Sequence, residues 1–221
     1  MVTMRSRPAR PLPRAAVLAV LLAALSAPAF GRDEPPPAKD AQAYPAVDVH
    51  AKEQVAIAAE PYDTKDKCKV FQVDYLAYHF MPIRIIVTNM GDRPISLNDA
   101  RIYFVDAAGQ RIQAAEPEDV ERRVMPKDSR GHDIPIGPIK MHTKGKASDE
   151  KIEADFNQYE YAALAVEPHT THAGFLFYDT DGLGNAPLRG AKLVLRELKN
   201  ADGQQLFYFE IPFDKYLDAR R

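Results

Sequence analysis

The sequence predicts a mainly β protein: an antiparallel β-sandwich of about seven to eight strands, with one or two short helices in a long insertion. Three observations lead to this fold class. Short apolar stretches alternate with polar residues, turn signals separate these stretches, and strands do not alternate with helices as a parallel α/β sheet requires. With 221 residues, 46% of them hydrophobic, the chain is long enough to bury one sizeable core.

The clearest strand lies in residues 82–88. Its apolar side chains Ile83, Ile85 and Val87 share one face, because side chains along a strand point alternately to opposite sides. The next segment, Asn89–Asp92, has the composition of a turn. Further strands are expected at 55–59, 70–73 and 95–97, with a hairpin formed by 102–105 and 110–114 around Ala107-Ala108-Gly109.

The insertion spans residues 117–159. Pro117–Val124 is expected to form a short helix, since proline is favoured in a first turn and acidic residues follow it. Residues 125–147 hold three Pro, three Gly and five Lys or Arg, and are expected to form a long loop, either solvated or a basic surface for an acidic partner. A second helix is expected to begin at Ser148 as its N-cap, with an apolar face formed by Ile152, Phe156 and Tyr159.

The C-terminal third returns to strands. Residues 163–166 lead into a turn at Glu167–Thr171, and residues 174–178 form a strand with aromatic side chains on both faces. The last two strands are expected at 191–198 and 205–211, joined by a tight turn that contains Asp202-Gly203. In the last strand Phe207, Phe209 and Ile211 fall on one face, which predicts that all three belong to the core.

Residues 1–31 have the composition of a secretory signal peptide. They contain four arginines and no acidic residue, an apolar run over 15–25, and small residues up to Gly31. The apolar run is shorter than the ~20 residues that a membrane-spanning helix needs. We expect cleavage near Gly31, or alternatively after Ala27, and a protein that is periplasmic or secreted. An uncleaved N-terminal anchor is the other interpretation.

The charge balance after such cleavage indicates no nucleic-acid partner. Without residues 1–31 the chain has 25 basic and 31 acidic residues, a net charge of −6, which provides no attraction for DNA, RNA or anionic lipid. Residues 32–46 are rich in proline and are expected to be a disordered linker. A single β-sandwich domain is expected over residues 47–221, with no transmembrane segment after cleavage.

Cys68 is the one cysteine of the chain, so an internal disulfide is impossible. It can act as a reactive or intermolecular thiol, because the neighbouring Lys65, Lys67 and Lys69 could lower the pKa of the thiol. Alternatively it is a small apolar residue beside a strand. No candidate base lies near it in the sequence, which favours the second interpretation.

Asp179, Asp181 and Asn185 are the best candidates for a calcium site. Two carboxylates two positions apart, followed by glycines, allow a turn to bring several oxygens onto one hard cation. The twelfth position counted from Asp179 is Gly190 rather than a bidentate Glu. Because Asp and Gly are also ordinary turn residues, a structural turn is the favoured interpretation.

A zinc site is the second metal hypothesis. His169 and His172 are three positions apart, and His132 and His142 lie in the expected loop. The first pair spans an expected turn, however, and no H-E-x-x-H motif is present. Exposed loop histidines are therefore the alternative interpretation.

No motif for nucleophilic catalysis or phosphate binding is present. The chain contains neither a G-x-S-x-G elbow nor a glycine-rich loop between a strand and a helix. We therefore expect a protein that is not an enzyme and has no cofactor. An envelope hydrolase without a recognisable motif is one alternative, and a calcium-dependent binding module is another.

Two stretches carry a resemblance to known proteins. Residues 83–97 (IRIIVTNMGDRPISL) resemble the early strands of bacterial exported immunoglobulin-like domains, and residues 166–177 (VEPHTTHAGFLF) are similar to their later strand–turn–strand unit. The resemblance covers about residues 53–213, implies an immunoglobulin-like sandwich and transfers no catalytic residue. With the signal peptide, it implies a binding or structural accessory protein of the bacterial envelope or exterior, whose partner is another envelope or extracellular protein.

Overall fold

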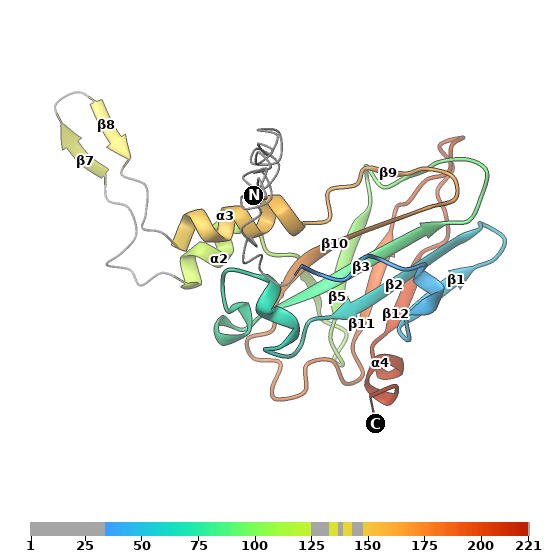
Figure 1. The fold of residues 1–221 in the computed structure, drawn as a ribbon, viewed down its shortest axis with the longest axis horizontal. Coiled ribbons are helices and arrows are strands. Elements are labelled where there is room, and N and C mark those ends of the chain that lie inside the picture. Colours follow the sequence, from blue (N-terminus) through green and yellow to red (C-terminus); the bar gives the residue numbers. More distant parts are fainter. Residues whose placement is uncertain (1–33, 125–132, 137–138, 143–147, 221) are drawn as a thin grey trace, which may run out of the picture. The chain divides into compact units, whose positions relative to one another are not determined.

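The computed structural model describes residues 34–124, 133–136, 139–142 and 148–220. Among these residues, two four-stranded antiparallel sheets form a sandwich, which confirms the predicted fold class (Figure 1). The first sheet has the strand order β1-β2-β3-β10. Its strands are β1 (Val47–His50), β2 (Val55–Pro61), β3 (Phe80–Asn89) and β10 (Thr170–Asp179).

The second sheet has the order β12-β11-β5-β6. The chain passes from β3 in the first sheet to β5 in the second, and from β10 back to β11. This arrangement matches an immunoglobulin sandwich, in which strands B and E pair in one sheet and strands C, F and G in the other. The strands of the second sheet are β5 (Arg101–Val105), β6 (Arg111–Gln113), β11 (Lys192–Arg196) and β12 (Phe209–Pro212).

Two short strand pairs accompany the sandwich. The first joins β4 (Ile95–Ser96) to β9 (Ala165–Val166). The second joins β7 (Asp133–Ile136) to β8 (Ile139–His142), inside the segment 125–147 that was expected to be a loop. That expectation is therefore wrong for these eight residues, because Ile134, Ile136, Ile139 and Met141 provide enough alternation for a hairpin.

Apolar side chains from both sheets fill the space between them. Ile83, Ile85 and Val87 of β3 point into this core as predicted, and none of them is exposed to solvent. The second sheet contributes Phe104, Leu193, Leu195, Phe209 and Ile211 to the same cluster.

A second core covers the outer face of the first sheet, so that every residue of β3 is buried. The 3-10 helices η2 (Lys67–Val70) and η3 (Tyr75–Tyr78) and the α-helices α2 (Pro117–Val124) and α3 (Ser148–Tyr159) supply side chains to it. Phe156 of α3 stacks on Phe177 of β10 with ring centroids 4.4 Å apart. The insertion helices, predicted from the sequence, therefore complete this layer.

Residues 70–73 differ from the expected strand. The chain forms η2 and then a bend, although Val70, Phe71 and Val73 are buried in the second core. Their backbone does not pair with a neighbouring strand; instead the N–H groups of Gln72 and Val73 donate to the carboxylate of Asp155 in α3. Alternating apolar residues can therefore occur in a loop whose N–H groups bond to a side chain of a helix, as well as in a strand.

Part of the expected linker belongs to the fold. Asp40 caps the 3-10 helix η1 (Ala41–Ala43), and Ala41 and Ala46 are fully buried. The N–H of Ala41 donates to Oγ1 of Thr88 at 2.9 Å, which fixes this segment on the outer face of β3. Ala41 packs there with Ala56, Ala58 and Ile86. This part of the expected linker 32–46 is therefore not disordered. The expected signal peptide, residues 1–31, lies outside the described residues.

The C-terminal segment was not anticipated as a helix. Residues Asp214–Asp218 form α4, and the hydroxyl of Tyr216 donates to Oδ1 of Asp63 at 2.7 Å. Arg220 pairs with the other oxygen of Asp63 at 2.6 Å, so the chain end is attached to the segment that follows β2. In the described part of the chain, no helix has the length and apolar character needed to cross a bilayer.

Candidate functional site

The outer face of the second sheet is exposed, whereas that of the first sheet is covered. Along β11, Leu193 and Leu195 are buried in the core, and the alternate residues Lys192, Val194 and Arg196 point away from it. The strand pairing aligns residues of β5 and β6 with these outward positions. We call this surface the basic face and define it by Arg101, Tyr103, Arg111, Lys192, Arg196 and Tyr208.

Arginines stand directly opposite each other on this face. Arg101 of β5 and Arg196 of β11 are cross-strand partners. Lys192 and Arg111 lie on either side of Val105, two rows further along the same face. Like charges at directly opposite positions destabilise a sheet. Glu197 lies beside Arg101 and offsets part of this repulsion, but it leaves Arg196 without an acidic partner among the described residues.

Acidic neighbours neutralise only part of the basic face. Arg101 pairs with Glu197 at 3.2 Å and Lys192 pairs with Glu210 at 2.8 Å. Within the described part of the chain, no acidic side chain lies within ion-pair distance of Arg111 or Arg196. Two arginines thus remain free to bind an external anion in a protein whose net charge is −2.

Two hollows lie on the basic face and share Arg196. The first, of about 350 Å³, is lined by Arg111, Arg196, Tyr208 and the valines Val105 and Val194, among others. The second, of about 670 Å³, lies beside Arg101 and Lys199 and also contains the acidic Asp99 and Glu197. The first hollow therefore combines the two unpaired arginines with Tyr208 and two largely buried valines, and the Lys192–Glu210 ion pair also lines it. The unpaired arginines suit a ligand that carries carboxylates.

An exposed aromatic pair borders the basic face. Phe207 is 63% exposed and Tyr208 40% exposed, and their ring centroids are 4.4 Å apart. The prediction that Phe207 belongs to the core with Phe209 and Ile211 is wrong, because β12 begins only at Phe209. The N–H of Phe207 donates instead to Oε1 of Glu53 at 2.8 Å.

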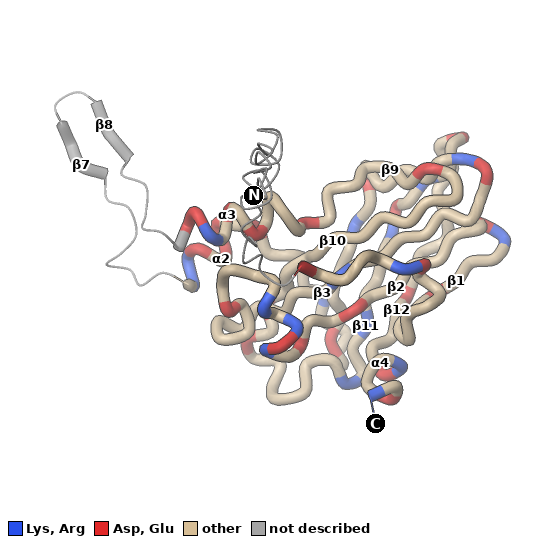
Figure 2. Tube along the Cα trace, in the orientation of Figure 1, with Lys and Arg blue, Asp and Glu red and all other residues tan. Residues whose placement is uncertain are grey.

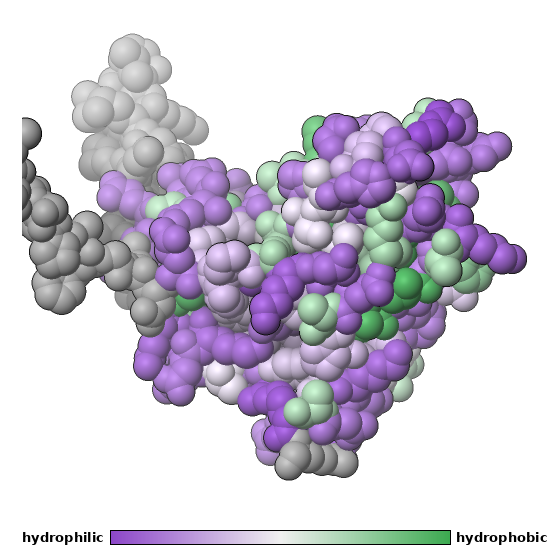
Figure 3. Space-filling model, turned by 45° about the vertical axis from the view of Figure 1, so that its right-hand side comes forward, coloured by the Kyte–Doolittle hydropathy of each residue, from purple (hydrophilic) through white to green (hydrophobic). Residues whose placement is uncertain are grey.

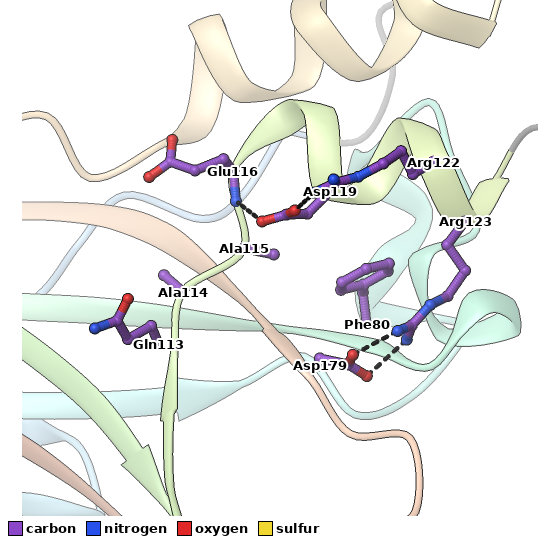
Figure 4. A pocket seen from close by; sticks show the side chains of 9 residues that line it. All are labelled: Phe80, Gln113, Ala114, Ala115, Glu116, Asp119, Arg122, Arg123 and Asp179. Atoms are coloured by element: carbon purple, nitrogen blue, oxygen red, sulfur yellow. Dashed lines mark hydrogen bonds and ion pairs between the residues drawn. The ribbon is translucent and has the colours of Figure 1, made fainter. Parts of the chain in front are cut away.

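A separate pocket of about 530 Å³ lies beside α2 (Figure 4). Arg123 donates to both carboxylate oxygens of Asp179 at 2.6 and 2.5 Å, and its guanidinium lies 4.8 Å from the centre of the Phe80 ring. The hydrogen bonds from Arg123 hold the pKa of the Asp179 carboxyl below its usual range. Arg122 pairs with Asp119 in the same pocket, so each cation has an anion beside it.

The calcium candidates follow β10 at the edge of this pocket. Asp179 is engaged by Arg123, and Oδ1 of Asp179 also accepts the N–H of Asp181 at 2.9 Å, which forms an Asx-turn. The side chains of Asp181 and Asn185 are exposed. The described residues contain no group of three His, Cys, Asp or Glu that could hold a metal. Calcium binding stays a prediction, and it would have to compete with Arg123.

The zinc candidates are not brought together among the described residues. His169 has a positive φ of 55°, and its Nε2 lies 2.9 Å from Oδ1 of Asp92. His172 is an exposed residue of β10, and His142 belongs to β8. His132 lies outside the described residues.

Cys68 lies in the 3-10 helix η2 and is buried in the second core. Its Sγ donates to the carbonyl oxygen of Tyr62 at 3.1 Å, and burial raises the pKa of the thiol to about 12. The neighbouring Lys67 and Lys69 pair with Glu60 and Asp66 rather than activating the thiol. The geometry therefore favours the interpretation of Cys68 as a small apolar residue.

The comparisons with known proteins assign no family to this chain. No family model and no curated protein matches it. Among solved structures, it is similar to the X-ray structure of Northeast Structural Genomics Consortium target SoR45, with a TM-score of 0.28 and 9% identity. That match covers 72% of this chain and 86% of the other. A likeness at this level supports no argument about function, which must come from the site itself.

Proposed function

We propose that this chain is an exported, non-enzymatic binding module that recognises an acidic segment of another envelope or extracellular protein through the basic face. The observation that carries the proposal is the opposition of Arg101 and Arg196 on adjacent strands. Arg196 has no anionic partner within the described part of the chain, and an acidic side chain placed between the two arginines would relieve their repulsion.

The surroundings of the arginines support an extended protein ligand. On the basic face, tyrosines and valines lie between the cations. Tyrosine and arginine are the residue types most enriched at protein–protein contacts. An acidic chain laid across the face could place carboxylates on Arg111 and Arg196 while its stem packs on Val194 and Tyr208.

Fluorescence anisotropy with labelled poly-L-glutamate tests this proposal. We expect the purified protein to bind poly-L-glutamate at low salt, to release it as salt screens the charges, and not to bind poly-L-lysine. Replacing Arg111 and Arg196 by serine is expected to raise the Kd by about tenfold or more. The matched control replaces Arg189 and Lys215, two exposed cations outside the face, and is expected to bind like the wild type.

Two results would overturn the proposal. One is equal binding by the Arg111/Arg196 variant and the Arg189/Lys215 control, which would show that the basic face takes no part. The other is binding to an acidic polysaccharide such as polygalacturonate but not to poly-L-glutamate. That result would replace the protein partner by a glycan.

A further inference from the structure

A second charged surface lies on the insertion helices. Glu121 of α2 lies close enough to Glu118 and, on the neighbouring helix α3, to Asp149 and Glu153 for their charges to act on it. We call these four residues the acidic helix face. The two helices run beside each other, and Figure 2 marks acidic residues along both. Burial and the neighbouring carboxylates Asp149, Glu118 and Glu153 raise the pKa of Glu121. This surface, like the basic face, therefore repels itself.

Of the three basic residues in these helices, Arg122, Arg123 and Lys151, two pair with acids outside this surface. Arg122 pairs with Asp119, and Arg123 reaches across to Asp179. One oxygen of Asp149 is buried without a hydrogen-bond partner. Among the described residues, no cation lies within ion-pair distance of these four carboxylates, and the same chain presents unpaired arginines on a different surface.

We infer that the basic face of one molecule binds the acidic helix face of a second copy, so that the protein associates head to tail. This inference rests on the proposed function, for which it names the acidic partner. Four basic residues would meet four acidic ones, and the contact would relieve the like-charge repulsion on both sides. Because the two surfaces differ, the contact is heterologous and leaves one of each surface free at the ends. Association can therefore continue beyond the dimer as concentration rises.

Little apolar surface is available for a different mode of association on the side that carries β1. Figure 3 shows hydrophobic residues there in small groups separated by hydrophilic ones. Large exposed apolar side chains among the described residues are few: Val49, Leu164 and the adjacent pair Phe207 and Tyr208. An interface driven by charge with aromatic support from Phe207 and Tyr208 fits this distribution better than a hydrophobic one.

A charge-swap experiment by sedimentation velocity tests the inference. The face variant carries Arg101→Glu and Arg196→Glu, and the helix variant carries Glu118→Lys and Glu153→Lys, all at exposed positions. We expect the wild type to form concentration-dependent oligomers at low salt that dissociate at high salt. Each variant alone should be monomeric, and an equimolar mixture should regain association, because the intact helix face of one meets the intact basic face of the other.

The matched control is Arg189→Glu with Lys215→Glu, which changes the net charge as much as the face variant does and should associate like the wild type. Three results would overturn the inference: a monomeric wild type at low salt, association that survives in both variants, or a mixture that stays monomeric while circular dichroism shows both variants folded. If poly-L-glutamate still binds in any of these cases, the proposed function stands and only the identity of the partner is wrong. If it does not bind, both fail.

Discussion

The carboxylate of Asp155 accepts a hydrogen bond from the hydroxyl of Tyr75 at 3.1 Å, across 80 positions of the chain. The same carboxylate accepts the N–H groups of Gln72 and Val73, so a fully buried acid of α3 ties the insertion to the segment before β3. A buried carboxylate is tolerated only where donors surround it. This contact fixes the second core and with it the position of both insertion helices.

Replacing Asp155 by alanine is expected to lower the free energy of unfolding by about 3 kcal/mol, because the donors around it lose their acceptor inside the fold. Urea denaturation followed by circular dichroism measures this loss. Glu153→Ala, on the exposed side of the same helix, is the control and should cost less than about 0.5 kcal/mol. Equal losses in the two variants would show that Asp155 does not anchor the insertion.

Gly174 lies where another backbone passes very close. A Cβ added there would lie 2.5 Å from Cα of Tyr161 and 2.7 Å from its nitrogen. Since backbone cannot yield as a side chain can, Gly174→Ala is expected to lower the free energy of unfolding by about 3 kcal/mol. Gly109→Ala, at a φ of +84° with open space around it, should cost about 1 kcal/mol from backbone conformation alone. A smaller loss for Gly174 than for Gly109 in thermal unfolding would contradict this reading of β10.

The Arg123–Asp179 pair predicts a specific pH dependence. Because Arg123 lowers the pKa of Asp179 in the fold, the pair stabilises the protein above the unfolded carboxyl pKa of about 3.9, and this contribution is lost as pH falls through the lower folded value. Both side chains are about one-third exposed, so Arg123→Gln should cost only about 0.5 kcal/mol at pH 7 and less near pH 2, where only the contact with the Phe80 ring is lost. Urea titrations at the two pH values measure the difference. A cost that is the same at both would argue against the pair as its cause.

Calcium provides a second test of the same carboxylate. Because Asp179 is already paired, millimolar calcium is expected to leave the Tm of the wild type unchanged. A clear rise in Tm, abolished by Asp181→Asn, would instead establish the calcium site at Asp179, Asp181 and Asn185. Differential scanning fluorimetry with magnesium as the control ion distinguishes the two outcomes.

Cys68 is expected to resist modification in the folded protein. Its pKa of about 12 and its burial leave almost no accessible thiolate at pH 8. Ellman's reagent should therefore react slowly with the native protein and stoichiometrically after unfolding in urea. Rapid reaction of the native thiol would restore the hypothesis of a functional cysteine.

The sandwich could be predicted from the sequence because its core strands obey a local rule. Ile83, Ile85 and Val87 alternate into the core, and the insertion helices carry their own start signals at Pro117 and Ser148. The prediction from this alternation was wrong where the backbone bonds to side chains of distant segments instead of to a neighbouring strand. Phe207 bonds through its backbone to Glu53, and residues 70–73 bond to Asp155. Such partners are far away in sequence and leave no local pattern.

The basic face was missed for a related reason. Arg101, Arg111 and Arg196 each stand next to an apolar residue that packs on the core, namely Ile102, Ile112 and Leu195, so the sequence contained the signal that they point outward. Only the pairing of β11 with β5, and of β5 with β6, brings them onto one surface. Topology of this kind cannot be read from the spacing of residues. The alternative that residues 125–147 form a basic surface for an acidic partner was a prediction based on local charge alone.

The central claim is that an acidic partner binds the outer face of the second sheet. Backbone amide chemical shifts measured by NMR during titration with a glutamate-rich peptide test it most directly. We expect shift changes concentrated at Arg101, Tyr103, Arg111, Val194 and Arg196, and absent from β2 and the outer face of β3. Changes confined to the α2 pocket around Arg123, or no changes at saturating peptide, would contradict it.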